Sequence, residues 1–271
     1  ALIIFKIFNI KLVIGGDYPY VRMSYAGQIA HKLGIQTIFL RGDTYFTAYP
    51  FDIRTLSAEP YYEDLYERHF SDLKQIDLET AEQSLKARCS GDRSIINMPS
   101  ISIKETHLNR KLLKNNCIWI FLHDFYDAPG EHGINTIFKD HLQWVVETID
   151  FCKLQKDIDI FVKVHPNSRP KNKFILSKLK RRFTNVHWVD TDISLVQIKD
   201  CFNPNAILSV YGSVIVEASF LEIPVICAGR NRYVSRKLGI LPKNKSDYFE
   251  ELMRCCKKRV STPNKVDAVI A

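Results

Sequence analysis

The second half of the chain alternates short apolar runs with segments whose apolar residues recur at helical spacing. The apolar runs predict buried strands over residues 117–122, 158–164, 186–189, 206–210 and 224–228. The helical spacing predicts helices over residues 134–149, 173–183, 193–200, 213–221 and 246–257. Because strands separated by helices pair in parallel, this half predicts a parallel sheet covered by helices on both faces.

The first half shows the same kind of pattern less regularly. Its apolar runs and helical spacing predict strands over 11–15 and 35–40, helices over 25–33 and 61–87, and a loop over 89–97. Residues 43–60 are aromatic and rich in turn formers, and they predict no regular element. Lysine, asparagine and serine dominate residues 100–116, which predicts a boundary between two domains, residues 1–112 and residues 113–271.

Composition permits a large core and places the net charge in one segment. The 271 residues are 46% hydrophobic and carry a formal net charge of +8. Eight basic residues and no acidic residue lie within residues 163–182, which equals that whole charge. Such a segment suits a phosphorylated ligand, an acidic polymer or an anionic membrane surface, and a solvated lysine-rich helix is the simpler alternative. Aromatic residues are not interleaved with these basic residues as a stacking surface for bases would require, so no nucleic-acid partner is expected.

Cysteine usage and hydropathy indicate the compartment. The seven cysteines form no CxxC pair, which is typical of a reducing cytoplasm and predicts neither a zinc site nor a disulfide framework. No apolar run reaches the ~20 residues of a membrane span, and residues 1–14 lack a signal-peptide cleavage pattern. We therefore expect a cytoplasmic protein, with peripheral association at the inner membrane through the basic helix as a further expectation.

Polar residues with chemical potential follow the predicted strands of the second half. Ligands of parallel sheets bind beyond the carboxyl ends of the strands, so these residues are expected to converge on one edge. They are His123, Asp124 and Asp127 after the first strand, Lys163 and His165 at the second, Gly212, Ser213 and Glu217 after the fourth, and Arg230 and Arg232 after the fifth. Histidines, carboxylates, arginines and a helix start at one edge predict a polar, anion-binding active site.

Residues 207–229 read as a strand, a Gly-Ser turn, a short helix and another strand. Unpaired N–H groups at the helix start favour an anion, Ser213 adds a hydroxyl, and Gly212 allows close approach of a ligand. Glu217 follows Ser213 by about one helical turn, where its carboxylate can accept hydrogen bonds from a ribose. This is the layout of a sugar-nucleotide site, and a βαβ unit without a ligand is the alternative.

Each candidate role has a structural alternative. His165 can donate a hydrogen bond to a phosphate or act as an acid, or it can cap carbonyls at a strand end. Asp124 and Asp127 can serve as a base or orient a sugar hydroxyl, or they can form Asx turns. Arg230 and Arg232 can bind a phosphate or carboxylate, or they can be surface arginines.

A metal site is not expected. His123, Asp124, Glu131 and His132 are the candidate ligands. Their spacing matches neither HExxH nor a closed tetrahedral set, so we predict no metal.

Three segments resemble bacterial capsule and surface-polysaccharide biosynthesis proteins. In chain order they read FLHDFYDAPG (121–130), VKVHPN (162–167) and YGSVIVEASFLEIPVICAGRNRY (211–233). The resemblance implies a GT-B-like glycosyltransferase with two Rossmann-like domains of parallel sheets, the first of them incomplete here. It implies that His165 contacts the donor phosphate, that Ser213 binds the same group, and that Glu217 holds the ribose.

The resemblance also implies the substrates. The His-Pro pair is similar to that of transferases that use CMP-activated acidic sugars such as Kdo or sialic acid, and UDP- or CDP-linked donors remain open. The nucleotide sugar is a co-substrate, the acceptor is a surface polysaccharide or lipid-linked acceptor, and no cofactor is expected. A polyol-phosphate transferase that uses CDP-glycerol and a non-catalytic binder of nucleotide sugars or polysaccharides are the alternatives.

Overall fold

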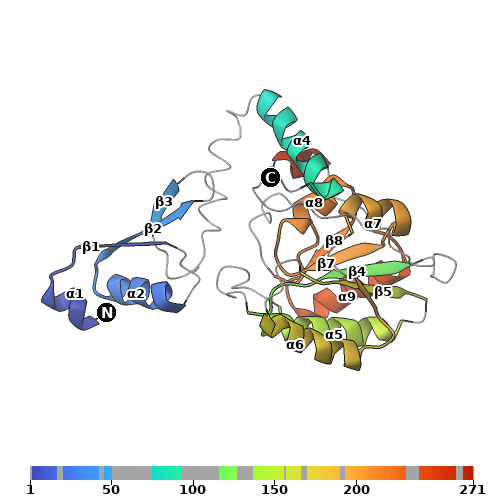
Figure 1. Ribbon diagram of the computed structural model, residues 1–271, viewed down its shortest axis with the longest axis horizontal. Coiled ribbons are helices and arrows are strands. Elements are labelled where there is room, and N and C mark those ends of the chain that lie inside the picture. Colours follow the sequence, from blue (N-terminus) through green and yellow to red (C-terminus); the bar gives the residue numbers. More distant parts are fainter. Residues whose placement is uncertain are drawn as a thin grey trace. The chain divides into compact units, whose positions relative to one another are not determined.

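The computed structural model describes residues 2–16, 21–42, 46–50, 75–92, 116–126, 137–155, 157–165, 170–189, 193–229, 238–260 and 265–270. The chain divides into two compact units (Figure 1). Unit 1 comprises residues 1–71 and 128–134, and unit 2 comprises residues 72–127 and 135–271.

Unit 1 contains the predicted strand–helix–strand pattern and one further strand. Its elements are α1 (Leu2–Ile7), β1 (Leu12–Gly16), α2 (Val21–Lys32), β2 (Gln36–Gly42) and β3 (Phe46–Pro50). Strand β2 pairs in parallel with β1 and antiparallel with β3. The expectation that residues 43–60 hold no regular element is therefore wrong for β3. Pairing with β2 stabilises this short strand, and such pairing leaves no periodic signal in the sequence.

Unit 2 contains the predicted parallel sheet. Its strands are β4 (Cys117–Phe121), β5 (Asp159–Lys163), β6 (His187–Val189), β7 (Ala206–Ser209) and β8 (Val225–Cys227). They are arranged in the order β6-β5-β4-β7-β8, and every neighbouring pair is parallel. Side chains alternate between the two faces of a strand, and these strands are almost continuously apolar. Both faces of the sheet are therefore apolar, and helices cover both.

One face of the sheet packs against α5 (His141–Lys153), α6 (Pro170–Arg182) and α9 (Lys245–Lys257). The other face packs against α7 (Leu195–Phe202) and α8 (Val214–Phe220). On that second face Trp119 of β4 stacks on Phe161 of β5, with ring centroids 4.6 Å apart. Both layers of helices are visible in Figure 1.

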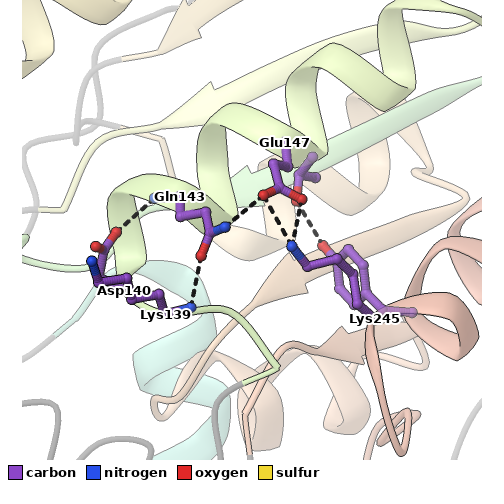
Figure 2. A network of polar contacts seen from close by, with 7 residues as sticks. Lys139, Asp140, Gln143, Glu147 and Lys245 are labelled. Carbon is purple, nitrogen blue, oxygen red and sulfur yellow. Dashed lines mark hydrogen bonds and ion pairs between the residues drawn. The ribbon is translucent and has the colours of Figure 1, made fainter.

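Helix α5 has a side-chain N-cap and forms polar contacts with α9 (Figure 2). The side chain of Asp140 accepts a hydrogen bond from the backbone N–H of Gln143, and this N-cap starts the helix at residue 141. The described residues 137–139 precede this cap and are not helical, so the helix predicted over 134–149 starts too early. Glu147 accepts hydrogen bonds from Gln143 at 2.7 Å and from Lys245 of α9 at 2.9 and 3.0 Å.

Two helices of unit 2, one before and one after the segments that form its sheet, pack against each other. Helix α4 (Gln75–Ser90) packs against α7, α8 and α10 (Lys265–Ile270). Cys89, which was expected in a loop, is helical and fully buried among residues of α7 and α8. Residues 93–115 lie outside the described part of the chain, so the boundary at residues 112 and 113 stays a prediction. Among the described helices, none combines the length and apolar character that crossing a bilayer requires.

Candidate functional site

The strand order of unit 2 creates a reversal point beside the central strand β4. From β4 the chain moves outward through β5 to β6, and it then returns to the other side of β4 through β7 and β8. The carboxyl ends of β4 and β7 therefore flank the position where the direction of winding reverses. In open parallel sheets, ligands bind in the crevice at this position. The segments that follow these strands are residues 122–126 and 210–213.

His123 connects the two segments. Its Nε2 accepts a hydrogen bond from the backbone N–H of Tyr211 at 3.0 Å and lies 3.2 Å from Oγ of Ser209. A backbone N–H can only donate, so Nε2 is an acceptor and the neutral ring carries its proton on Nδ1. A Cβ atom added to Gly212 would lie 3.6 Å from Cε1 of His123, so the ring lies beside the turn. His123 thus fixes the loop after β7 against the end of β4.

The Gly212–Ser213 turn leads from β7 into α8. Gly212 has φ of +146°, a conformation that side chains strongly disfavour. Ser213 is exposed and occupies the N-cap position, yet its side chain forms no capping hydrogen bond with the helix. The hydroxyl is therefore not used to satisfy α8 itself. The turn presents a glycine backbone and a serine hydroxyl beside His123.

Glu217 lies one turn into α8 and forms an ion pair with α4. Its Oε1 accepts a hydrogen bond from Nη2 of Arg88 at 2.7 Å, and both side chains are partly buried. Sγ of Cys89 lies 3.5 Å from the carbonyl oxygen of Glu217. Arg88 is a component of this edge that sequence reasoning missed as a site residue, because it lies 129 positions from Glu217 and no spacing pattern connects them.

The buried thiols of unit 2 have low reactivity. Burial raises the pKa of Cys89 to about 12, and the negative charge of Glu217 adds to this rise. Burial also raises the pKa values of Cys117 and Cys255 to about 12. These thiols stay protonated near neutral pH, so they are poor nucleophiles and poor metal ligands. Within the described ranges no cluster of three or more potential metal-binding side chains occurs, and the absence of a metal stays a prediction.

Lys163 places a positive charge under the same edge. It is the last residue of β5 and only 6% exposed, and its Nζ lies 5.2 Å from the ring centroid of Phe121, the last residue of β4. Contact with an aromatic face stabilises a cation that burial would otherwise disfavour. His165 follows two residues later, partly exposed, just past the strand end. Lys163 and His165 thus lie at the carboxyl end of β5, next to that of β4.

Asp124 is buried, with 3% of its surface exposed. Its Oδ1 accepts hydrogen bonds from the backbone N–H of Tyr126 and from Nδ2 of Asn172 on α6, both at 2.9 Å. The bond to Tyr126 is the Asx turn that the sequence left open as the alternative. A role for Asp124 as a base stays a prediction.

Two buried residues support the loop after β4 and were not foreseen as part of the site. Asn172 of α6 binds the carboxylate of Asp124. Nδ1 of His141, at the start of α5, lies 3.4 Å from the carbonyl oxygen of Asp124, and its ring centroid is 5.0 Å from that of His123. His141 is the first residue of α5, and Asn172 is the third residue of α6. This position in the first turn of a helix is the one sequence signal that places them near the edge.

Three further candidates lie outside the described residues. They are Asp127, Arg230 and Arg232, and their proposed roles stay predictions.

No protein-family model matches this sequence, and no curated protein matches it. Among solved structures, the chain is similar to Thermosulfurimonas dismutans KpsC, a beta Kdo 2,4 transferase, at 16% identity with a TM-score of 0.54. That similarity covers 96% of this chain and 78% of the transferase. UDP-GlcNAc 2-epimerase of Methanocaldococcus jannaschii aligns with a TM-score of 0.46 at 15% identity, over 99% of this chain and 76% of the epimerase. The likeness to the transferase confirms the predicted fold, an α/β, GT-B-like architecture of Rossmann-like domains; the sheet of unit 2 is parallel throughout, and β3 adds one antiparallel strand to that of unit 1.

Proposed function

We propose that the chain is a glycosyltransferase that binds a nucleotide sugar at the carboxyl edge of the unit 2 sheet. The observation that carries the proposal is the bond from the backbone of Tyr211 to His123. It fixes the Gly212–Ser213 turn at the point where the winding of the sheet reverses, and nucleotides bind at such points in α/β folds. The likeness in fold to a Kdo transferase supports the same class of reaction.

The donor phosphate is the group that this edge suits best. The Gly212–Ser213 turn offers a hydroxyl and close backbone approach, Lys163 supplies a buried positive charge, and His165 is accessible at the neighbouring strand end. Departure of the sugar leaves one additional negative charge on the nucleotide phosphate. Positioned donors and cations lower the energy of such a charge without moving, and this is a large catalytic effect in enzymes. No metal ion is needed in this proposal.

The ribose is assigned to Glu217. Arg88 binds one carboxylate oxygen of Glu217, and an ionised carboxylate offers about four acceptor positions in total. The ion pair therefore orients the side chain and leaves acceptor capacity for ribose hydroxyls. Arg88 acts here as a positioning residue from α4.

Proton removal from the acceptor hydroxyl is assigned to a carboxylate of the loop after β4, Asp124 or Asp127. Asn172 and the backbone of Tyr126 already bind Asp124, and these two bonds fix the conformation of the loop. We propose a CMP-linked acidic sugar as the donor, with UDP-linked sugars as the alternative, and a surface polysaccharide or lipid-linked acceptor.

Calorimetric titration with CMP, UDP and CDP tests the proposal. At least one nucleotide is expected to bind, and Ser213→Ala and Glu217→Gln are each expected to weaken binding about tenfold, the effect of losing one hydrogen bond to a charged group. Ser177→Ala and Glu82→Gln are matched controls, because each removes the same group from a helix away from this edge: Ser177 is exposed on α6, and Glu82 is partly exposed on α4 and ion-paired as Glu217 is.

The proposal fails if none of the three nucleotides binds, or if both site variants bind as the unaltered chain does. Product analysis then separates the rival functions. A phosphodiester product identifies a polyol-phosphate transferase, and tight binding with neither transfer nor donor hydrolysis identifies a binding protein.

A further inference from the structure

Helix α6 exposes a face that combines basic side chains with an aromatic ring. Lys173, Phe174, Ser177, Lys178 and Arg181 are all exposed, and their spacing places them on one side of the helix. Phe174 is 61% exposed although it is a large apolar residue. The opposite side of the helix packs Leu176 and Leu179 into the core beneath the sheet. Figure 1 shows α6 next to α5 at the border of unit 2.

Among the residues that the structure describes, no negative charge balances this face. Helix α6 contains no acidic residue. Among the basic side chains described on α6, only Arg182 forms an ion pair, with Asp150 of α5 at 2.6 Å near the ends of both helices. Asp150 therefore compensates Arg182 and leaves the charges of Lys173, Lys178 and Arg181 facing solvent.

Stability of the helix does not explain the whole pattern. Basic residues at the C-terminal end, such as Arg181, interact favourably with the helix dipole, whereas Lys173 lies in the first turn, where the dipole disfavours a cation. Nζ of Lys178 lies 4.3 Å from the ring centroid of Phe174. This contact partly stabilises the ring and leaves most of its surface in water. An exposed phenylalanine within a cationic face indicates a partner that binds both the aromatic ring and the basic side chains.

We propose that this face of α6 docks on an anionic phospholipid bilayer, with Phe174 inserted at the interface and Lys173, Lys178 and Arg181 bound to headgroups. Clustered basic side chains are attracted to an anionic membrane surface, and an exposed aromatic ring among them can insert at the interface. Single-stranded nucleic acid fits less well, because it needs several aromatic side chains for successive bases and this face offers one. The inference stands independently of the proposed enzymatic activity.

Co-sedimentation of the purified chain with vesicles tests the inference. We expect binding to vesicles of phosphatidylcholine mixed with phosphatidylglycerol and none to pure phosphatidylcholine. Lys173→Gln/Lys178→Gln is expected to lower the partition coefficient about 25-fold, about fivefold for each lysine. Phe174→Ala is expected to lower it roughly tenfold. Binding should disappear in 1 M salt, where the screening length falls to about 3 Å.

Matched variants elsewhere on the chain decide whether α6 is the contact. Lys257→Gln/Lys258→Gln removes two exposed lysines at the end of α9, and Phe8→Ala removes a phenylalanine that is 69% exposed beyond α1. Both are expected to bind vesicles as the unaltered chain does. Thermal unfolding should be unchanged in every variant, because all the altered side chains are exposed.

Several outcomes would overturn the inference. One is the absence of binding to the anionic vesicles, and another is an equal loss of binding in a control variant. Release of the chain by soluble glycerol phosphate would show a phosphate site rather than a bilayer contact. Displacement of the vesicles by an oligonucleotide would show that nucleic acid is the preferred partner.

Discussion

Replacing His165 with alanine is expected to lower the turnover of sugar transfer by about two to three orders of magnitude. His165 lies partly exposed at the carboxyl end of β5, two residues after the buried Lys163. In the proposed reaction its ring donates a hydrogen bond to the phosphate that gains charge as the sugar leaves. Loss of a positioned donor at such a group removes stabilisation that water replaces poorly. Initial rates of transfer, measured with saturating donor, give the size of the effect.

His187→Ala is the matched control for this prediction. His187 begins β6, and its Nε2 lies 3.6 Å from Asp159 at the amino end of β5, so the same ring is removed from the far end of the strands. Turnover is expected to change little in this variant. Equal turnover in the His165 variant and the unaltered chain would remove His165 from the mechanism.

Replacing Trp119 with alanine is expected to lower the free energy of unfolding by about 3–5 kcal/mol. The side chain is fully buried in β4, stacks on Phe161 and contacts the edge of Phe202, whose ring centroid is 5.2 Å away. Alanine would leave a large cavity between the sheet and α7, and the surrounding rings cannot fill it without moving. Chemical denaturation, followed by circular dichroism, measures the change.

Trp188→Ala provides the comparison. Trp188 lies in β6, is only partly buried, and donates a hydrogen bond from Nε1 to the carbonyl oxygen of Phe183 at 3.1 Å. Its loss is expected to cost clearly less than the loss of Trp119. Equal free energies of unfolding in the two variants would contradict the prediction that the fully buried Trp119 stabilises the fold more than Trp188 does.

The sheet of unit 2 was predictable because its strands are buried on both faces. Continuous apolar runs such as residues 117–122 and 206–210 leave little choice but a central parallel strand, and β4 and β7 occupy them. The edge strand β3 and the short helix α10 were not predictable in this way. Strand β3 depends on pairing with β2, and helix α10 depends on packing against α4 and α8. The residues of these two elements therefore show no clear periodicity of apolar positions.

The candidate site was predictable to the extent that it depends on strand ends. The rule for carboxyl ends placed His123, Lys163 and Ser213 at one edge, and the structure has them following β4, in β5 and following β7. The rule does not predict residues that helices contribute to this edge. Arg88 arrives from α4 and Asn172 from α6, through contacts that only the folded chain creates.

The attachment of α4 to unit 2 has a practical consequence for dissecting the protein. Recombinant fragments are commonly cut where composition changes, which in this chain is near residue 112. Such a fragment would lack Arg88 and the buried Cys89, and it would expose the apolar surface of α8 that they cover. A fragment that starts before residue 72 would keep this cover, because unit 2 begins there. Soluble yield of the two fragments would show how far the C-terminal sheet relies on a helix encoded well upstream of it.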